Sequence, residues 1–202
     1  MYTFQEASKQ SALEVGQEGL RLAQHHLKVA NGFILSPRYE ETFYASNNLP
    51  EQIRKLFVGI NPKRIDEDLL EVACEKAQKL MIESYLLDDP IQRIYLALKN
   101  SGLSGRPVHV RRPDDLHFEA TETTYPGREV LVALKKLWAR DWDFEQVLNR
   151  LDHQGSIALD ARPAFILEGL KPELNSELSQ DWGGKVYTCF GEVVGFLQPA
   201  EG

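Results

Sequence analysis

Cysteine is scarce in this sequence of 202 residues, and the two that occur, Cys74 and Cys189, lie far apart. No Cys-x-x-Cys pair or cysteine–histidine cluster suggests zinc, and we expect no metal site. Long apolar runs are also missing, because no window approaches the roughly 20 residues of a transmembrane helix. The opening residues, MYTFQEASKQ, lack the basic flank and apolar stretch of a signal peptide. We therefore expect a cytoplasmic protein that does not insert into membranes.

The sequence also has fewer basic than acidic residues. Lysine and arginine number 23 against 30 aspartate and glutamate residues, which gives a net charge of -7. This balance argues against a general nucleic-acid binder, because such proteins neutralise phosphates with clustered cations. The remaining composition, 43% hydrophobic and 26% charged, is typical of a globular protein. A chain of this length can bury a core without disulfides.

Apolar residues recur at helical spacing in much of the first half of the chain. The clearest helix follows Asp66, a good N-cap residue, and its expected apolar face consists of Leu69, Leu70, Ala73, Ala77, Leu80 and Met81. Further helices are predicted near Ser11, at Pro50, at Asp89-Pro90 and after Gly127.

The second half has more strand-like segments. Strands are predicted at residues 107–110, 117–125, 156–159, 164–167, 185–190 and 192–197. Gly191 separates the last two, and glycine supplies the positive φ that a tight hairpin needs. The sequence thus predicts an α+β fold, with a helical N-terminal part packed on a small β-rich part. We expect residues 155–202 to be a β-rich C-terminal extension of the domain formed by residues 1–154.

Six short motifs follow one another over residues 15–140: VGQEGLRL at 15–22, NGFIL at 31–35, VRR at 110–112, DDL at 114–116, FEATETTY at 118–125 and KKLWA at 135–139. In order and spacing this stretch resembles a shortened, altered nucleotide-binding domain of phosphoenolpyruvate synthase and pyruvate phosphate dikinase. The resemblance implies a truncated ATP-grasp-like fold for residues 1–154, and ATP with magnesium as a possible ligand. It also implies phosphate-binding positions at Arg111, Arg112 and Gly19.

The departures from the family fall on the residues that carry its chemistry. Glu18 stands where the family has a phosphate-binding lysine, and a carboxylate there would repel a polyphosphate. Arg112 and Pro113 replace two serines, which removes hydroxyl ligands and one backbone donor. The family's second, metal-binding subdomain and its phosphohistidine domain are also outside the resemblance. Phosphoryl transfer depends on cations placed around the transferred group, so we expect no catalytic residues here.

Several side chains have two interpretations. Arg111 and Arg112 either grip a phosphate or form a solvated pair bridged to Asp114 and Asp115. His109 is either a general acid or base beside that loop or a histidine satisfied by its strand neighbours.

Two functions follow from the resemblance and the departures. The first is a non-catalytic regulatory or assembly module that acts through a protein partner, with Trp182 and Phe190 as the tentative contact residues. The second is an ATP or phosphate sensor with a residual nucleotide site at Arg111 and phosphotransferase ancestry. The losses at 18, 112 and 113 favour the first, because they are more easily explained by abandoned catalysis than by a new mechanism.

Overall fold

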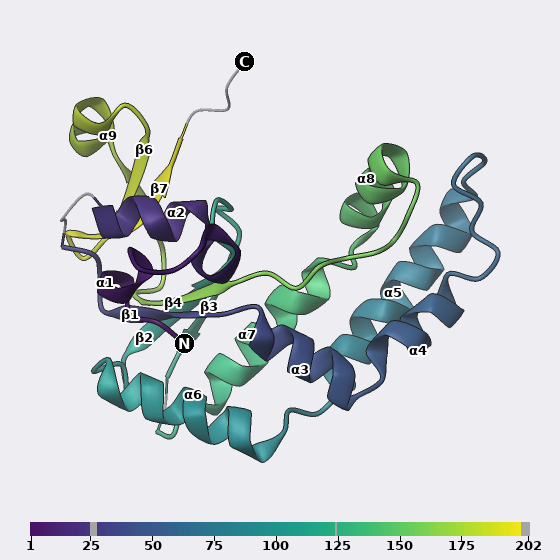
Figure 1. Cartoon of the computed structure of the whole chain (residues 1–202), viewed down its shortest axis with the longest axis horizontal. Coiled ribbons are helices and arrows are strands. Elements are labelled where there is room, and N and C mark those ends of the chain that lie inside the picture. Colours follow the sequence, from purple (N-terminus) through teal and green to yellow (C-terminus); the bar gives the residue numbers. More distant parts are fainter. Residues whose placement is uncertain (25–27, 124, 199–202) are drawn as a thin grey trace.

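The computed structural model describes residues 1–24, 28–123 and 125–198 (Figure 1). Within these ranges the chain has an α+β fold with nine helices and two antiparallel sheets, as the sequence predicts. The helices are α1 (Phe4–Ala7), α2 (Ala12–Gln24), α3 (Arg38–Ser46), α4 (Leu49–Leu56), α5 (Glu67–Glu83), α6 (Asp88–Asn100), α7 (Arg128–Arg140), α8 (Phe144–Gln154) and α9 (Ser176–Trp182). The strands are β1 (Gly32–Leu35), β2 (Pro107–Arg111), β3 (Phe118–Glu122), β4 (Ala164–Glu168), β5 (Glu173–Asn175), β6 (Lys185–Cys189) and β7 (Glu192–Leu197).

The larger sheet has the strand order β1-β4-β2-β3, with every neighbouring pair antiparallel. Its composition corrects two expectations. Residues 32–35, which are not among the predicted strands, form the strand β1, and residues 156–159, predicted as a strand, have no regular structure. Strand β4 lies between β1 and β2, so one part of the segment 155–202 is an inner strand of this sheet, whereas β5, β6 and β7 form the smaller sheet.

Both faces of the larger sheet are buried. Phe33, Val108, Val110 and Ile166 belong to a large core shared with α3, α4, α5, α6, α7 and α8. The alternate residues Ile34, Phe165 and Leu167 belong to a second core shared with α1, α2 and the strands β6 and β7. In Figure 1, α2 lies above the sheet and α7 below it, so the molecule is layered around β4.

Local signals account for several element ends. The Asp66 carboxylate accepts a hydrogen bond from the Leu69 amide at 3.2 Å and caps α5, and Asp143 caps α8 through the Gln146 amide at 2.8 Å. Pro50 lies in the first turn of α4, where its missing N–H costs nothing. The apolar face expected for α5 is correct except at Leu69, whose side chain is exposed.

The smaller sheet has the order β5-β6-β7 and carries α9 beside it. The predicted hairpin is confirmed as β6 and β7, joined at Phe190 and Gly191. Strand β7 contacts α2, so this hairpin lies over the second core. No helix in the described ranges has both the length and the apolar character needed to cross a bilayer.

Candidate functional site

The centre of the predicted site is a buried ion pair between Arg111, the last residue of β2, and Glu18 on α2. The two guanidinium nitrogens Nη1 and Nη2 each contact one oxygen of the Glu18 carboxylate at 2.7 Å. The Arg111 and Glu18 side chains are only 2% and 0% exposed. This is the bidentate geometry in which arginine binds a carboxylate or a phosphate. The group that it holds here is a carboxylate of the same chain.

Backbone groups satisfy the remaining capacity of this pair. Arg111 Nη2 also donates to the Val194 carbonyl at 2.6 Å, and Nη1 donates to the Arg112 carbonyl at 3.1 Å. The Glu18 carboxylate accepts from the amides of Asp114 and Phe196, each at 2.7 Å. The ion pair therefore ties α2, the end of β2 and strand β7 to one another.

Strand β7 and the ring of Phe165 enclose the Arg111 guanidinium. The Phe165 ring centroid lies 4.9 Å from its central carbon, within the range of a cation–π contact. On the β7 side Gly195 has no side chain, and a Cβ there would lie 3.1 Å from Arg111 Nη2 and 3.4 Å from the Glu18 carboxylate. The C-terminal hairpin therefore covers the place where the resemblance puts a phosphate-binding arginine.

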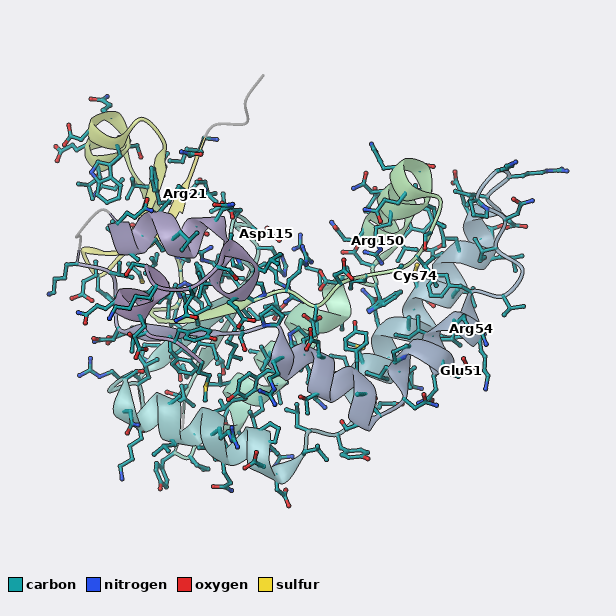
Figure 2. All side chains as sticks on the ribbon, viewed as in Figure 1. Arg21, Glu51, Arg54, Cys74, Asp115 and Arg150 are labelled. Atoms are coloured by element: carbon teal, nitrogen blue, oxygen red, sulfur yellow. The ribbon has the colours of Figure 1, made fainter. Side chains whose placement is uncertain are left out.

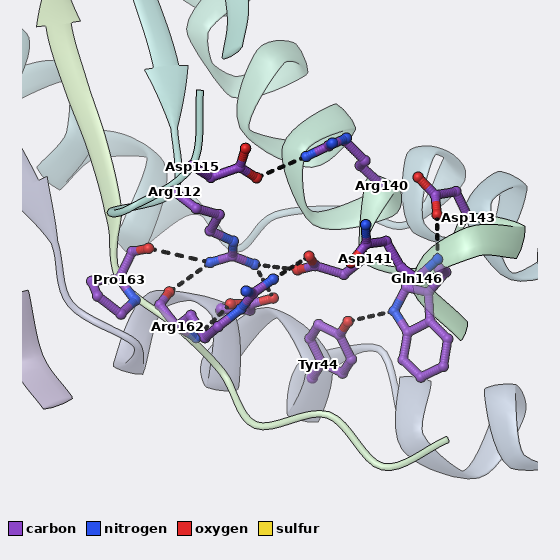
Figure 3. Close-up of polar contacts among 11 residues, drawn as sticks. Tyr44, Arg112, Asp115, Arg140, Asp141, Asp143, Gln146, Arg162 and Pro163 are labelled. Atoms are coloured by element: carbon purple, nitrogen blue, oxygen red, sulfur yellow. Dashed lines mark hydrogen bonds and ion pairs between the residues drawn. The ribbon is translucent and has the colours of Figure 1, made fainter. Parts of the chain in front are cut away.

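Arg112 is held by a second buried network (Figure 3). Its Nη2 donates to Glu40 at 2.8 Å and to Asp141 at 2.6 Å, and Nη1 donates to the Arg162 carbonyl at 2.7 Å. The Arg162 guanidinium also contacts Asp141, and the Arg162 amide donates to Glu40 at 3.0 Å. This network joins α3, the end of α7 and the segment before β4 to the loop after β2.

Burial and charge pairing act together on the pKa values of this network. Burial alone would lower the pKa of Arg112, but the carboxylates of Glu40 and Asp141 outweigh it and raise that pKa. Burial raises the pKa of the Glu40 carboxyl, while the Arg112 guanidinium opposes the rise. Two carboxylates thus share one buried guanidinium, and the partly exposed Arg162 supplies further positive charge at Asp141.

The interpretation of Arg111 and Arg112 as a solvated pair does not match these contacts. Asp114 pairs with Arg21 and Asp115 pairs with Arg140 at 2.8 Å, so the expected solvated bridge within the loop is wrong. A phosphate at Arg111 would have to displace Glu18, and one at Arg112 would have to displace Glu40 and Asp141. The structure therefore places both arginines in buried, internally paired positions.

Gly19 is not at a loop that faces a ligand. It lies within α2, where a Cβ would be 3.3 Å from the Ile34 side chain and 3.5 Å from the Phe165 ring. In this structure Gly19 allows close packing of α2 on the sheet, and the phosphate contact expected there stays a prediction. The break in α2 comes instead at Gly16, whose φ of 77° bends the helix beside Pro113.

The two predicted contact residues have different surroundings. Trp182 ends α9 and is half-buried against Phe196, with ring centroids 5.2 Å apart. Phe190 is 77% exposed at the tip of the β6–β7 hairpin. Its φ of 51° is also a left-handed value that bulky side chains rarely adopt. Trp182 therefore packs against the second core, whereas Phe190 is exposed to solvent.

His109 lies in the middle of β2 and is fully buried. Its Nδ1 is 3.0 Å from the Gly169 carbonyl, and its ring meets the Phe118 ring edge-on at 5.8 Å. Burial lowers the pKa of His109 to about 4, and the hydrogen bond to Gly169 only partly offsets that effect. The Nδ1 contact matches the interpretation of a histidine held by its neighbours, but the buried Nε2 has no hydrogen-bond partner among the described residues.

Sequence reasoning missed Glu40, Asp141 and Arg162. They are 72, 29 and 50 residues from Arg112 along the chain, and no motif links them. A weak signal was available at Glu40, which falls on the buried side of a short helix with apolar neighbours. Among the residues with described positions, no group of three or more histidine, cysteine, aspartate or glutamate side chains is arranged to hold a metal ion.

No protein-family model and no curated protein sequence matches the chain.

Proposed function

We propose that this chain is a non-catalytic regulatory or assembly module that acts through protein–protein contacts and derives from a dikinase nucleotide-binding domain. The observation that carries the proposal is the bidentate ion pair between Arg111 and Glu18. On the resemblance, Arg111 is the cation that a phosphate would need. In this chain the Glu18 carboxylate is already paired with the Arg111 guanidinium.

Energetics favour the internal partner over a ligand. Withdrawing Arg111 toward an anion would leave the Glu18 carboxylate buried without its cation, and breaking a buried pair in this way costs about 3–5 kcal/mol. The displaced carboxylate would also lie beside the incoming phosphate and repel it. Strand β7 blocks the approach as well, because Val194 and Gly195 lie directly against the guanidinium.

Phe190 supports a contact outside the chain. Its backbone conformation is unfavourable for a bulky residue, by about 1–3 kcal/mol for strained positions of this kind. Its ring is also exposed to water at the tip of a hairpin. Strained, exposed aromatic residues are found where function requires them, and burial of the ring in a partner would recover its apolar contribution.

Calorimetric titration of the full chain with ATP and magnesium tests the proposal. We expect no binding in the micromolar range for the native chain. Arg111→Ala is the site variant, and Arg54→Ala is the matched control, because Arg54 is an exposed arginine paired only with Glu51 on its own helix. Micromolar binding that is lost in Arg111→Ala and kept in Arg54→Ala would support a nucleotide sensor instead. ATP-dependent phosphorylation of pyruvate, water or a protein would also overturn the proposal.

A further inference from the structure

The outer edge of β3 is a strand edge without a partner strand among the described residues. β3 is last in the sheet order and is hydrogen-bonded only to β2. The opposite edge is different, because Tyr2 bridges β1 at Ile34 with two backbone hydrogen bonds of 2.9 and 2.8 Å. One edge of the larger sheet is therefore capped by the chain's own N-terminal segment, and the other is open.

The register of the β2–β3 pair shows which backbone groups point outward. Thr123 N donates to Arg106 O at 3.3 Å, and this pair is in register with the ladder. Hydrogen-bonded pairs alternate along an antiparallel ladder, so Thr121 and Glu119 bond inward to β2. The N–H and C=O groups of Phe118, Ala120 and Glu122 therefore face away from β2. No backbone partner for them is present in the described part of the chain.

This edge lacks most of the features that usually block strand addition. It contains no proline, and the β2–β3 register runs through all five pairs without a bulge. Ala120, in the middle, has only a methyl group. A shallow groove beside the edge, between β3 and α7, is lined by Glu119, Ala120, Thr121, Glu129, Val132, Ala133 and Lys136. Val132 exposes an apolar surface in that groove.

Charge selects the kind of strand that fits. Glu119 projects toward α7 and Glu122 toward the opposite face, so an added strand meets a carboxylate on either side. The ionisable side chains beside Glu119 are His117, at 3.3 Å, and Lys136 and Glu129, which line the same groove. A second copy of the chain would add two more glutamates to an edge that already carries two and would bring no compensating cation in β3, which is unfavourable for paired strands. A strand with lysine or arginine residues three positions apart would point one cation to each face and so place a cation near each carboxylate.

We infer that the β3 edge, residues 118–122, is a docking site for an extended, basic segment of a partner protein, which adds to the larger sheet as a fifth strand beside β3. This inference deepens the proposed protein-binding function and rests on it. Main-chain hydrogen bonds to residues 118, 120 and 122 supply affinity, and Glu119 and Glu122 supply the preference for basic side chains.

The test is amide hydrogen exchange of the full chain, followed by NMR with and without synthetic peptides. The probes are sets of ten-residue peptides with lysine or arginine three positions apart and varied apolar residues between, with matching sets that carry glutamate or threonine instead. With a basic peptide at saturation we expect exchange at Phe118, Ala120 and Glu122 to slow by about tenfold or more. The inward amides of Glu119 and Thr121 should change little. The glutamate peptides should have no effect.

Two variants identify the site. Ala120→Pro removes an outward N–H without removing a β2–β3 hydrogen bond, so circular dichroism should show a folded chain that no longer binds. Glu119→Gln with Glu122→Gln keeps the backbone edge and should weaken binding of basic peptides by about tenfold. The matched control is Glu75→Gln with Glu83→Gln, which removes two exposed carboxylates from α5 and should leave binding unchanged.

Other outcomes would overturn the inference. Equal protection by the threonine peptides would remove the preference for basic segments. Protection that rises with protein concentration in the absence of peptide would identify a second copy as the occupant. Absence of protection by any basic peptide at millimolar concentration would exclude docking at this edge. These failures would leave the proposed function standing, because that function is tested separately by the titration with ATP.

Discussion

The pair of Arg111 and Glu18 shows how one acidic residue can take up the binding capacity of an arginine that it contacts. An exposed arginine at the end of a strand is free to bind an anion, but Arg111 is neutralised in place by Glu18. Buried pairs of this kind add little net stability compared with apolar side chains, yet they are costly to break. They also fix geometry, because both groups must keep their partners.

The first prediction concerns this pair. Arg111→Ala should lower the free energy of unfolding by about 3–5 kcal/mol, because Glu18 is left buried without its cation. The double variant with Arg111→Leu and Glu18→Leu should lose much less free energy of unfolding than Arg111→Leu alone, because it leaves no buried charge without a partner. Urea unfolding of the native chain, both single variants and the double variant completes the thermodynamic cycle. Equal and additive losses would show that the two groups do not interact.

His109 provides a prediction about pH. Its pKa is lowered to about 4 in the folded chain, from an ordinary value of 6.5. The unfolded chain therefore binds the proton more readily between these values, so the stabilising contribution is present above pH 6.5 and is lost as the pH falls toward 4. We expect the free energy of unfolding to fall by roughly 2–3 kcal/mol between pH 7 and pH 4.5 from this group.

His109→Asn isolates that contribution. The variant keeps a polar group near the Gly169 carbonyl but does not titrate in this range, so its unfolding free energy should change less with pH than that of the native chain. Glu40 acts in the opposite direction, because its raised pKa favours the folded state at low pH. The difference between the two chains at each pH cancels Glu40. Parallel pH profiles would contradict the assignment to His109.

At the scale of elements, the β6–β7 hairpin serves two purposes. Its strands cover Arg111 and Glu18 through Val194, Gly195 and Phe196, and its tip holds Phe190 in solvent. The inner part of the hairpin is thus constrained by packing. The tip carries Phe190, whose ring is exposed and whose φ is unfavourable for phenylalanine, so the fold of the described chain does not explain the choice of this residue.

A substitution at the tip tests that distinction. Phe190→Asn should raise the free energy of unfolding by up to about 1 kcal/mol, because asparagine tolerates left-handed φ values better than phenylalanine does. Thermal and urea unfolding measure the change. Val186→Asn, on the buried side of β6, is the contrasting variant and should be strongly destabilising. A loss of stability in Phe190→Asn would mean that the ring contributes to the fold of the isolated chain.

Figure 2 labels residues on opposite sides of the molecule. Cys74 on α5 and Arg150 on α8 lie on the side of the molecule away from Arg21 and Asp115. Arg150 is placed over the Trp142 ring at 5.1 Å, and burial lowers the pKa of its guanidinium. Burial raises the pKa of the Cys74 thiol to about 11, so this cysteine stays protonated at neutral pH. Cys74 is 2% exposed and packs in the larger core.

At the scale of the whole molecule, β4 joins the two cores. Ala164 and Ile166 face the larger core, while Phe165 and Leu167 face the smaller one. A change in β4 must therefore be transmitted to both. Trp138 and Trp142 belong to the larger core, and Trp182 packs against the smaller one.

Ile166→Ala tests this coupling. Because Ile166 is fully buried, we expect a loss of about 2–5 kcal/mol in the free energy of unfolding. Tryptophan fluorescence and far-ultraviolet circular dichroism should report one shared transition before and after the substitution. Leu96→Ala, at an exposed position on α6, should shift the midpoint little. Two separated transitions would show that the cores unfold independently.

The sequence by itself determined the local features of this protein. Capping at Asp66, Pro50 at the start of α4, the hairpin around Gly191 and the α+β class all follow from short-range periodicity and turn chemistry, which act within a few residues. It also indicated that Glu18 is incompatible with a phosphate nearby.

Only the tertiary structure decided where the charges go. Glu18 meets Arg111 across 93 residues of sequence, and Arg112 meets Glu40 across 72. The central place of β4 depends on strand pairing that no local pattern specifies. The open β3 edge likewise depends on which strand ends the sheet. These contacts are long-range, and each is fixed by burial, because a charge removed from water must find its partner wherever the fold brings one.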